Sequence, residues 1–547
     1  MSLMHLHFHH DSSIGFSPYE GEYRVFELER FTKKRYFALE FIDDEVLAEE
    51  WDKNLAEECF KYVAECIARE YGVQYLTITR LTYDQVINIK THVVKELFSI
   101  LHKHFDIQCN STPVEHHEAH ALSAFYQSPY KEALVFSYDG GGRKVAPYEM
   151  EYTTVWYVNR NAYHNKLHNL PYSPVSFYGA LGYRCKDTYQ GRWLSIAGKA
   201  MGLQSYGVSD PELYSKLYPA FFGVNKLGWN LHGNCADVNS DFLNETIKNS
   251  FNGTTDKLEF WDASRLLATS QHVFEDVIIR TIEPYAEKYQ LPIVLTGGGA
   301  LNVICNSRIK NHFKLPTFVP CNPNDVGVAL GPLFKYRNPQ YQVKVTYNNF
   351  DLFDRDKLDH YVKERKAIVY KNSDLVKLIR EGKIIGVVRG KSECGPRALG
   401  NRSILCDPSF ANMKDILNSK VKDREWYRPF APVVLEEKAS EYFVWDGSPS
   451  PFMSFSTHVK MEYQQQLASV THVDFTARLQ TVNKEDNQWL YNLLKDMEST
   501  GLPVLLNTSF NIKGKPILNS IEDALHVLDN TQLDFVVVEQ YLFAKSK

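Results

Sequence analysis

Histidine and aspartate side chains recur at spacings that suit a metal ion. His116 and His120 stand four residues apart, so on a helix their imidazoles share one face and could bind one cation. Asp139 and the pair His10-Asp11 follow strand-like stretches and offer further ligands or a base. The zinc-protease motif His-Glu-x-x-His is disfavoured, because Glu118 takes the third position. The alternative is a helix that carries surface histidines.

Two glycine turns follow apolar stretches. The first is Asp139-Gly140-Gly141-Gly142, and the second is Gly297-Gly298-Gly299, which leads into Asn302. Glycine lets a backbone approach a phosphate closely, with its N–H groups directed at the anion. Either turn alone is typical of an ordinary strand-to-helix connection. Two in one chain indicate the duplicated phosphate clamp of the actin, sugar-kinase and Hsp70 superfamily, and Asp325 could complete a metal or nucleotide site.

A basic stretch lies between residues 383 and 428. It holds ten Lys and Arg against five Asp and Glu, a balance of +5 in a chain whose net charge is -5. Arginine forks match the oxygens of phosphates and carboxylates. The stretch contains Gly, Pro, Trp426 and Phe430, whereas solvated charged faces are usually Glu/Lys-rich helices, so we interpret it as an anion pocket. Gly386 to Ser392 is not a P-loop, because three residues rather than four separate its glycines.

The elements that must position these groups alternate between strands and helices. Apolar runs predict strands at 133–138, 291–296, 384–388 and 502–506, and helical patterns cover 44–70, 83–104, 263–290 and 373–381. The N-terminal alternation predicts a strand with His5, His7 and His9 on one face. Polar residues alternate along 472–480 and 505–511 and could line one pocket floor. The whole pattern predicts an α/β fold with a linker near residues 337–360.

Length and composition narrow the class of protein. A chain of 547 residues exceeds one ordinary domain, and 44% hydrophobic with 23% charged residues describes a globular protein. The net charge of -5 disfavours a dedicated nucleic-acid binder, and no apolar run reaches the ~20 residues of a membrane span. Nine scattered cysteines without a Cys-x-x-Cys pair, and the lack of an apolar signal region, predict a reduced, cytoplasmic protein.

Taken together, these motifs resemble those of the ATP-dependent O-carbamoyltransferase family, of the tobramycin and nodulation-factor type. The resemblance runs nearly from end to end and is weakest over residues 208–262. It is carried by His10-Asp11, Glu29 to Lys34, His116-His117-x-x-His120, Asp139 to Gly142, Gly198 to Leu203, Tyr206-Gly207, Gly297 to Asn302, Asp325 to Gly327, Gly395 to Ser403, Arg428 to Pro432 and Leu506 to Asn511. Many ordered motifs at compatible spacings are far more specific than any one of them.

The resemblance implies two domains. Residues 1–350 would form an actin/Hsp70-like (ASKHA) domain of two subdomains, similar to the universal tRNA threonylcarbamoyl transferase, and residues 351–547 a YrdC-like α/β domain. The C-terminal domain would make carbamoyl-adenylate from carbamoyl phosphate and Mg-ATP, and the N-terminal domain would pass the carbamoyl group to a hydroxyl of a small-molecule acceptor. A divalent metal would sit at the transfer site. Iron is the expected ion, and Mn or Zn suits the same mixed nitrogen and oxygen ligands.

The resemblance also implies roles for particular residues. The metal ligands would be His116, His120, Asp139 and Asp325, with His10, beside Asp11, as the base for the acceptor hydroxyl. Nucleotide and phosphate at the transfer site would contact Gly140, Gly141, Gly142, Lys199, Gly297, Gly298, Gly299 and Asn302. Carbamoyl phosphate and ATP would bind in the C-terminal domain through Arg397, Arg402, Ser403, Lys422, Arg424, Arg428, Arg478, Asn507 and Ser509.

The acceptor and the assembly state stay open at this point. Sugars, antibiotics, other natural products and nucleosides all carry suitable hydroxyls. The expected contact regions are Arg30 to Phe37 and the tyrosines Tyr172, Tyr178, Tyr183, Tyr189 and Tyr206. A homodimer is one option for the assembly, and neither a membrane nor nucleic acid is an expected partner. The alternatives are a tRNA threonylcarbamoyladenosine-type modification enzyme, disfavoured by the net charge, and a non-catalytic nucleotide-binding scaffold, disfavoured by the set of His, Asp and Arg residues.

Overall fold

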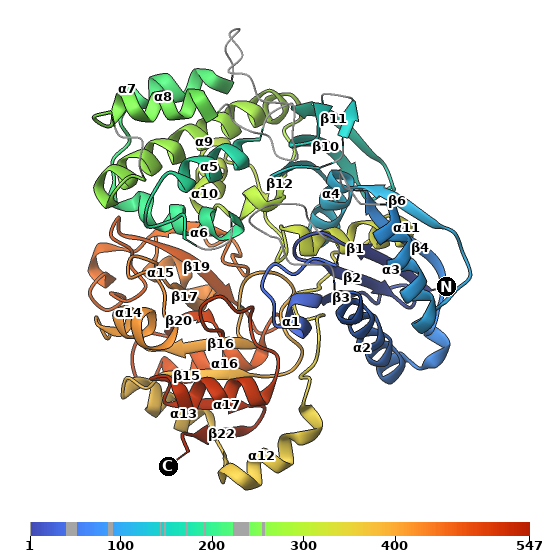
Figure 1. The fold of residues 1–547 in the computed structure, drawn as a ribbon. Coiled ribbons are helices and arrows are strands. Elements are labelled where there is room, and N and C mark those ends of the chain that lie inside the picture. The colour runs from blue at the N-terminus through green and yellow to red at the C-terminus, as the bar shows by residue number, and fades with distance from the viewer. Residues whose placement is uncertain are drawn as a thin grey trace. The chain divides into compact units, whose positions relative to one another are not determined.

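The computed structural model describes residues 2–39, 52–85, 91–142, 144–146, 149–170, 173–190, 193–221, 240–253 and 257–546. These residues divide into two compact units (Figure 1). Unit 1 comprises Met1–Thr32 and Tyr36–Val345, and unit 2 comprises Lys33–Arg35 and Thr346–Lys547. Both units mix helices with strands, as the expected α/β fold requires.

The first sheet of unit 1 has the strand order β3-β2-β1-β4-β5, and β6 also pairs with β4. Its strands are β1 (Ser2–His7), β2 (Ser13–Ser17), β3 (Arg24–Glu27), β4 (Thr77–Gln85), β5 (Asp106–Ile107) and β6 (Ser111–Glu115). The strands β1, β2 and β3 form an antiparallel series, whereas β4 is parallel to β1, β5 and β6. The carboxyl ends of β1, β4 and β6 therefore lie at one edge of the sheet, which is where α/β proteins place their sites.

The second sheet of unit 1 repeats this strand order. It contains β7 (Glu132–Tyr138), β10 (Thr153–Asn159), β11 (His164–Leu170), β12 (Ile293–Thr296) and β13 (Thr317–Phe318), in the order β11-β10-β7-β12-β13. The strands β7, β10 and β11 are again antiparallel, and β12 is parallel to β7 and β13. Two sheets of one topology agree with the duplicated actin/Hsp70-like domain expected from the sequence. The short strands β8 (Lys144–Ala146) and β9 (Glu149–Met150) pair separately.

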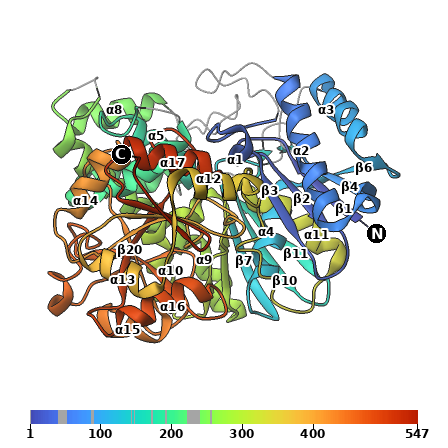
Figure 2. The same ribbon diagram turned by 90° about the horizontal axis from the view of Figure 1, so that it is seen from below.

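Helices pack against both sheets of unit 1, and α5, α6 and α7 pack on α9. The helices of unit 1 are α1 (Leu28–Thr32), α2 (Lys53–Tyr71), α3 (Thr91–His104), α4 (His116–Gln127), α5 (Pro174–Tyr183), α6 (Ile196–Leu203), α7 (Pro211–Leu217), α8 (Ser240–Ser250), α9 (Phe260–Tyr289), α10 (Val303–Phe313) and α11 (Gly331–Arg337). The helices α2 and α3 lie side by side (Figures 1 and 2). Helix α4 is buried along its whole length and contacts strands of both sheets. Helix α11 packs so closely on α4 that a Cβ on Gly331 would lie 2.1 Å from the Ala119 carbonyl oxygen.

A nine-stranded sheet organises unit 2, in the order β14-β22-β21-β15-β16-β20-β17-β19-β18. Its strands are β14 (Ile368–Val369), β15 (Ile385–Val388), β16 (Arg402–Cys406), β17 (Ala431–Leu435), β18 (Phe455–His458), β19 (Thr476–Val482), β20 (Val504–Ser509), β21 (Phe535–Val538) and β22 (Tyr541–Ala544). Its helices are α12 (Leu358–Arg365), α13 (Asn372–Arg380), α14 (Met413–Ile416), α15 (Ala439–Tyr442), α16 (Gln488–Met497) and α17 (Ile521–Asn530).

Each face of this sheet carries its own core. Successive side chains on a strand point to opposite faces, so Val387 packs with the leucines of α13 and α16, while Val388 packs with those of α17. On β16, the same alternation places Leu405 in the core with α13 and α16 and Ile404 in the core with α17. The sheet is thus covered on both sides, and its strand ends are left to carry polar groups.

The expected elements are present with shifted ends. The runs at 133–138, 291–296, 384–388 and 502–506 are β7, β12, β15 and β20, and the helices expected at 263–290 and 373–381 are α9 and α13. The helix expected from residue 83 is wrong at its start, because Tyr83 and Asp84 pair as part of β4 and α3 begins at Thr91. Residues 44–51 and 86–90 of the expected helices lie outside the described residues.

Two further sequence expectations can be compared with the structure. The N-terminal strand ends at His7, so His9 lies beyond it. Residues 338–354 carry neither helix nor strand, whereas the ends of the linker expected at 337–360 belong to α11, to the 3-10 helix η7 (Arg355–Lys357) and to α12. Over the part of the chain that the structure describes, no helix combines the length and apolarity needed to cross a membrane.

Candidate functional site

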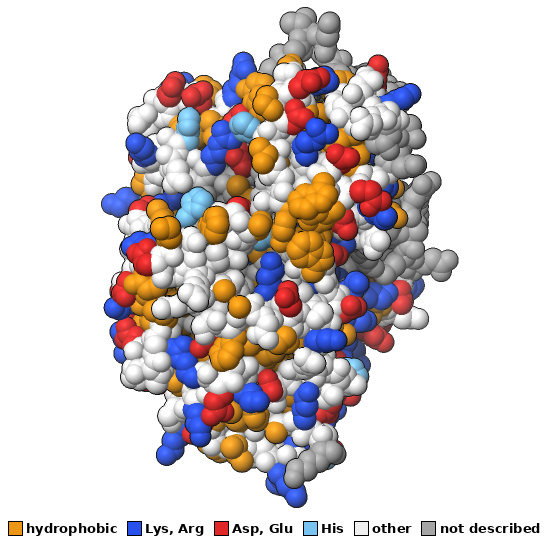
Figure 3. All heavy atoms as spheres, turned by 90° about the vertical axis from the view of Figure 1, so that its left-hand side faces the viewer, with side chains coloured by type: hydrophobic (Ala, Val, Ile, Leu, Met, Phe, Trp, Pro, Cys, Tyr) orange, Lys and Arg blue, Asp and Glu red, His pale blue; other side chains and the backbone are white. Residues whose placement is uncertain are grey.

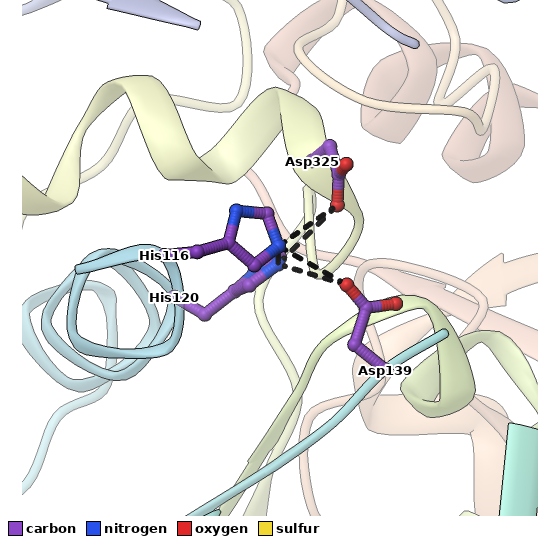
Figure 4. A group of neighbouring side chains, drawn as sticks. All are labelled: His116, His120, Asp139 and Asp325. Carbon is purple, nitrogen blue, oxygen red and sulfur yellow. Dashed lines mark hydrogen bonds and ion pairs between the residues drawn. The ribbon is translucent and has the colours of Figure 1, made fainter. Parts of the chain in front are cut away.

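Four side chains from three segments of unit 1 converge at one buried point, which we call the His–Asp centre (Figure 4). His116 and His120 lie on α4, Asp139 directly follows β7, and Asp325 begins the 3-10 helix η6 (Asp325–Ala329). The His120 Nε2 lies 3.2 Å from His116 Nε2, 3.4 Å from Asp139 Oδ2 and 3.3 Å from Asp325 Oδ1. The His116 Nε2 lies 3.2 Å from Asp139 Oδ2 and 3.8 Å from Asp325 Oδ1. The structure thus brings together the four side chains that the sequence analysis named as ligands.

The spacing of these atoms fits a divalent cation. Bonds of about 2.0–2.2 Å to nitrogen and oxygen place neighbouring ligand atoms roughly 2.8–3.6 Å apart in octahedral or tetrahedral geometry. The observed separations between the histidine nitrogens and the carboxylate oxygens run from 3.2 to 3.8 Å. Two imidazole nitrogens that face each other at 3.2 Å can share at most one proton, whereas both can bind one ion. Mixed nitrogen and oxygen donors do not choose among Fe, Mn and Zn.

The His–Asp centre favours positive charge. Burial and the neighbouring Asp325 oppose ionisation of Asp139, but hydrogen bonds with His116 and His120 hold its pKa below the usual range. Burial also opposes ionisation of Asp325, but the charges of His10 and His116 hold its pKa well below the usual range. Burial lowers the pKa of His116, and the carboxylates of Asp84 and Asp325 outweigh this and raise it well above its ordinary value. A field that draws protons onto these nitrogens also draws a metal cation.

His10 and Asp11 lie at the edge of the centre. The His10 ring is 29% exposed, with Nε2 3.5 Å from Asp325 Oδ2 and Nδ1 3.4 Å from Asp11 Oδ2. Burial lowers the pKa of His10, but the charge of Asp325 and the hydrogen bond with Asp11 raise it to about 9. The Asn324 amide donates to Asp11 at 3.2 Å, which ties this turn to the segment that carries Asp325. The turn thus presents one partly exposed imidazole beside the four ligands.

The two glycine turns meet at Asp139. Its Oδ2 faces the histidines, while its Oδ1 accepts a hydrogen bond from the Gly298 N–H at 3.0 Å. The start of α5 adjoins the first turn, because the Ser173 hydroxyl donates to the Asp139 carbonyl oxygen at 2.8 Å. One carboxylate therefore joins the second turn to the His–Asp centre.

The atoms around each glycine show whether close packing requires it or whether it leaves room for a ligand. Gly297 adopts a φ of 84°, and a Cβ there would lie 2.4 Å from the Tyr138 carbonyl oxygen, so close backbone packing requires this glycine. Gly299 packs on the Tyr138 ring and Gly142 on the His117 ring. A Cβ on Gly140, which precedes Gly141, would instead meet no atom within 4 Å. The first turn therefore leaves room for a ligand next to its backbone.

Lys199 and Asn302 are engaged within the protein. The Lys199 ammonium, on α6, donates to the Gln190 carbonyl oxygen. Asn302 caps α10 by accepting from the Cys305 N–H, and its amide exchanges two hydrogen bonds with Gln271 of α9. These contacts give Asn302 a role in holding the second turn against α9 and α10.

Unit 2 contains a group of side chains that we call the cation cluster: Arg397, Lys422, Arg424, Arg428 and Arg478. Arg478 lies on β19, and its Nε is buried without a hydrogen-bond partner among the described residues. Burial and the like charges of Arg397, Arg424 and Arg428 hold the pKa of Arg478 well below its ordinary value. Burial and Arg424 do the same to Lys422. Lys422 is buried and the four arginines are half-buried, so water screens their repulsion only in part, and the cluster fits a phosphate or carboxylate ligand.

Polar neighbours fix the orientation of these cations. The Lys422 ammonium donates to the Ser509 carbonyl oxygen, to the Ser509 hydroxyl at 3.2 Å and to Asn511. The Arg424 guanidinium donates to Asn418 at 2.7 Å and lies over the Phe430 ring. Lys422 and Arg424 are thus held in place before any ligand binds, which lowers the entropic cost of binding.

Other residues expected at this site build the adjoining loop. Arg402 is fully buried, and its guanidinium donates to the carbonyl oxygens of Arg389, Gly390 and Asn401 and to the Asn519 side chain. Ser403 accepts from the Gly400 N–H, and Asn507 donates to the Ala398 carbonyl oxygen and to Gln480. These side chains hold the loop that carries Arg397.

The sequence pattern does not reveal Asp84 or Glu393. Asp84 accepts a hydrogen bond from the His116 Nδ1 at 2.8 Å. The sequence signal for it is a carboxylate at the end of a strand that pairs with a histidine-rich strand. Glu393 is fully buried, and its Oε1 accepts the N–H groups of Leu399, Asn401 and Arg402. A single acid at the start of a basic, glycine-rich loop is the corresponding signal there.

The regions expected to contact an acceptor contain both buried and exposed side chains. Arg30 is buried and donates to Glu27 at 3.0 Å, and Tyr178 is buried against Phe274. Tyr183 and Tyr189 are exposed, and the Lys257 ammonium lies over both rings. Tyr172 lies outside the described residues.

Comparison with known proteins adds a family. Models described as carbamoyltransferase N-terminus and carbamoyltransferase C-terminus match residues 7–333 and 376–545. The chain is 34% identical to nodulation protein NolO of Bradyrhizobium diazoefficiens, over 79% of each chain. It is also 34% identical to nodulation protein NolNO of Sinorhizobium fredii, over 79% of this chain, and it spans 64% of the length of that protein. A crystal structure of full-length HypF in the phosphate- and nucleotide-bound form covers 61% of this chain and 55% of its own, with 11% identity and a TM-score of 0.36.

Proposed function

The chain belongs to the carbamoyltransferase family, and we propose that it transfers a carbamoyl group from carbamoyl phosphate, through an ATP-derived carbamoyl-adenylate, to a hydroxyl of a small molecule. The activating step is assigned to unit 2 and the transfer step to unit 1. The main support is that the described residues of each unit hold a group of charged side chains, the largely half-buried cation cluster in unit 2 and the buried His–Asp centre in unit 1.

In unit 2, the cation cluster would hold carbamoyl phosphate and the phosphates of Mg-ATP. Hydrolysis of carbamoyl phosphate releases inorganic phosphate and carbamate. A carbamate oxygen then attacks the α-phosphorus of ATP, the bond to the bridging oxygen breaks, and pyrophosphate leaves. Negative charge is present throughout, so the guanidinium charges of Arg397 and Arg478, with the ammonium charge of Lys422 that a bound anion would restore, would stabilise both the ligands and the transition state.

In unit 1, the acceptor hydroxyl oxygen would attack the carbonyl carbon of carbamoyl-adenylate, and the bond to AMP would break. His10, the partly exposed imidazole beside the ligands, would take the hydroxyl proton in its neutral form, which a cation at the four ligands would favour by offsetting the Asp325 charge that raises the pKa of His10. A divalent metal held by His116, His120, Asp139 and Asp325 would supply Lewis-acid polarisation of the carbonyl. The open backbone at Gly140 would receive the adenylate phosphate.

Pyrophosphate release tests the activating step. Wild-type protein with carbamoyl phosphate, ATP and Mg²⁺ should release pyrophosphate, and Arg397→Ala should abolish this release. His10→Ala should still release pyrophosphate and lose carbamoyl transfer, because His10 lies in unit 1. Lys495→Ala, at an exposed position on α16, is the control. The absence of pyrophosphate release, under conditions where a related carbamoyltransferase produces it, would refute the proposal.

A tRNA-modifying role has weaker support. RNA binding requires a continuous basic surface for the phosphate backbone. On the face drawn in Figure 3, acidic and basic side chains of the described residues are interspersed. Modification of tRNA that depends on threonine and bicarbonate would favour this role over transfer to a small molecule.

A further inference from the structure

Three side chains at one edge of the first sheet form a chain of contacts around Asp84. His7 is the last residue of β1, Asp84 is the penultimate residue of β4, and His116 is the first residue of α4, directly after β6. The strand β4 pairs with β1 on one side and β6 on the other, in parallel, and Asp84 is in register with Val114. This topology places Asp84 between the two histidines.

One oxygen of Asp84 holds both rings. The Asp84 Oδ2 lies 2.8 Å from His116 Nδ1 and 3.0 Å from His7 Nδ1. The Asp84 side chain is 1% exposed, and its Oδ1 is buried without a hydrogen-bond partner among the described residues. A buried carboxylate with one unpartnered oxygen is costly, so general packing does not account for an acid at this position.

The contact with Asp84 decides which nitrogen of His116 faces the His–Asp centre. An ionised carboxylate only accepts hydrogen bonds, so His116 Nδ1 must carry a proton. The lone pair of the neutral ring is then on Nε2, the atom that lies 3.2 Å from both His120 Nε2 and Asp139 Oδ2. Without Asp84 the ring could rotate or change tautomer, and Nε2 would no longer be held ready for a cation.

The same carboxylate acts on the turn that carries His10. The His7 Nδ1 donates to Asp84, and the His7 Nε2 lies 3.1 Å from the His10 carbonyl oxygen. His7 therefore connects Asp84 to the backbone of the residue proposed as base. Asp84 thus reaches a metal ligand through one histidine and the His10 turn through the other.

We propose that Asp84 is a positioning residue of the transfer site, which holds the Nε2 of His116 toward the metal and, through His7, fixes the turn of His10. This inference rests on the metal centre of the proposed function. An alternative is that His7, Asp84 and His116 bind a second ion, since their atoms also lie close enough for that. The His–Asp centre offers two histidines and two carboxylates, whereas this group offers one carboxylate and shares His116 with that centre, so we assign the ion to the four ligands and Asp84 to the outer sphere.

Co²⁺ binding to the full chain separates these cases without a transfer assay. Asp84→Asn keeps the shape of the side chain, and its carbonyl oxygen can occupy the Oδ2 position, but the negative charge is lost. We expect Co²⁺ affinity, followed by visible absorption, to fall by about 10–100-fold, which is usual for outer-sphere partners of metal ligands. Asp84→Ala should lower it further, because it also removes the acceptor.

Thr82→Val is the matched control. Thr82 lies two residues earlier on β4, is equally buried, and contacts His5 Nδ1 at 2.9 Å, as Asp84 contacts His7. It contacts none of the four ligands through the hydrogen bonds found, so Co²⁺ affinity should change by less than about threefold. Circular dichroism verifies the fold of each variant, and pyrophosphate release, a property assigned to unit 2, should stay at the wild-type rate in all of them.

The outcomes distinguish the inference from its premise. If wild-type protein binds no Co²⁺, the metal centre itself fails while pyrophosphate release can still stand. If wild-type binds one equivalent and folded Asp84→Asn binds it equally well, with the same spectrum, the positioning role is refuted and the centre remains. Two equivalents in wild-type and one in Asp84→Asn would overturn the inference in favour of Asp84 as a ligand.

Discussion

Replacing Arg478 by methionine should stabilise the ligand-free protein while it abolishes pyrophosphate release. Arg478 is half-buried near the like charges of Arg397, Arg424 and Arg428, and its Nε is buried without a partner among the described residues. Methionine has a similar length and no charge, so it removes both the desolvation cost and the repulsion. Replacing a buried ion pair by apolar side chains of similar volume is often neutral or stabilises other proteins by about 1–4 kcal/mol. We expect about 1–3 kcal/mol here, because methionine fills less volume than arginine.

This free energy converts into a measurable shift of melting temperature. Unit 2 has about 200 residues, a size at which 1 kcal/mol moves Tm by about 2–4 °C, so the rise should be about 2–12 °C. Inorganic phosphate should raise the Tm of wild-type protein, because a ligand at ten times its Kd stabilises the folded state by about 1.4 kcal/mol. The rise in Tm with phosphate should be smaller for the variant. Loss of two charge-assisted hydrogen bonds to a ligand, about 1.5–3 kcal/mol each, should slow pyrophosphate release by about 10²–10⁴-fold.

Arg380→Met is a control for which we expect Tm to change in the opposite direction. Arg380 lies on α13 and has its counter-ion in place, since it donates to Asp407 at 2.7 Å and to the Leu502 carbonyl oxygen at 2.8 Å. Its loss leaves the buried Asp407 unpaired, so Tm should fall and pyrophosphate release should persist at temperatures where the variant is folded. If Arg478→Met lowers Tm as Arg380→Met does, or if it releases pyrophosphate at close to the wild-type rate, Arg478 is a structural residue and the cation cluster is no anion site.

Lys422→Met should flatten the pH dependence of stability between pH 7 and 10, measured by thermal unfolding. Burial and Arg424 lower the pKa of Lys422 in the folded protein, so the native state binds fewer protons than the unfolded state. The stability of the wild-type protein therefore rises with pH toward the ordinary lysine pKa of 10.5. Equal slopes of stability against pH in the two proteins would contradict this. Gly298→Ala should weaken Co²⁺ binding, because its Cβ would lie 2.8 Å from Asp139 Oδ1 and displace that carboxylate. Gly140→Ala, where the Cβ meets open space, should keep Co²⁺ affinity and weaken AMP binding in equilibrium titrations, and the reverse pattern would refute the roles given to the two turns.

The four ligands of the His–Asp centre are predictable because local spacing determines them. His116 and His120 share a helix face whatever surrounds the helix, and Asp139 and Asp325 adjoin turns that glycine marks. Asp84 is not predictable in this way, because its importance comes from β4 lying between β1 and β6, and strand order is a long-range property. The same holds for the helix expected from residue 83, where pairing with neighbouring strands decided the outcome over local pattern.

The cation cluster shows a second limit of sequence reasoning. Arg402 and Arg478 both lie on strands of unit 2 and could not be told apart from their neighbours in the chain. The structure separates them by the acceptors around each guanidinium. Carbonyl oxygens surround Arg402, whereas other cations surround Arg478. Which arginine is left for a ligand depends on how the loop at 393–402 folds back, and that fold depends on the buried Glu393.

The hydrogen bond from Gly298 to Asp139 also has a thermodynamic consequence. Asp139 offers one oxygen to the metal site and the other to the backbone of the second glycine turn. A nucleotide that draws the Gly298 N–H toward its phosphate must change the charge that Asp139 presents to a cation. Metal and nucleotide affinities are then linked, and by reciprocity each ligand changes the affinity for the other by the same factor. Magnitude and sign of that factor can be measured by titrating AMP with and without Co²⁺.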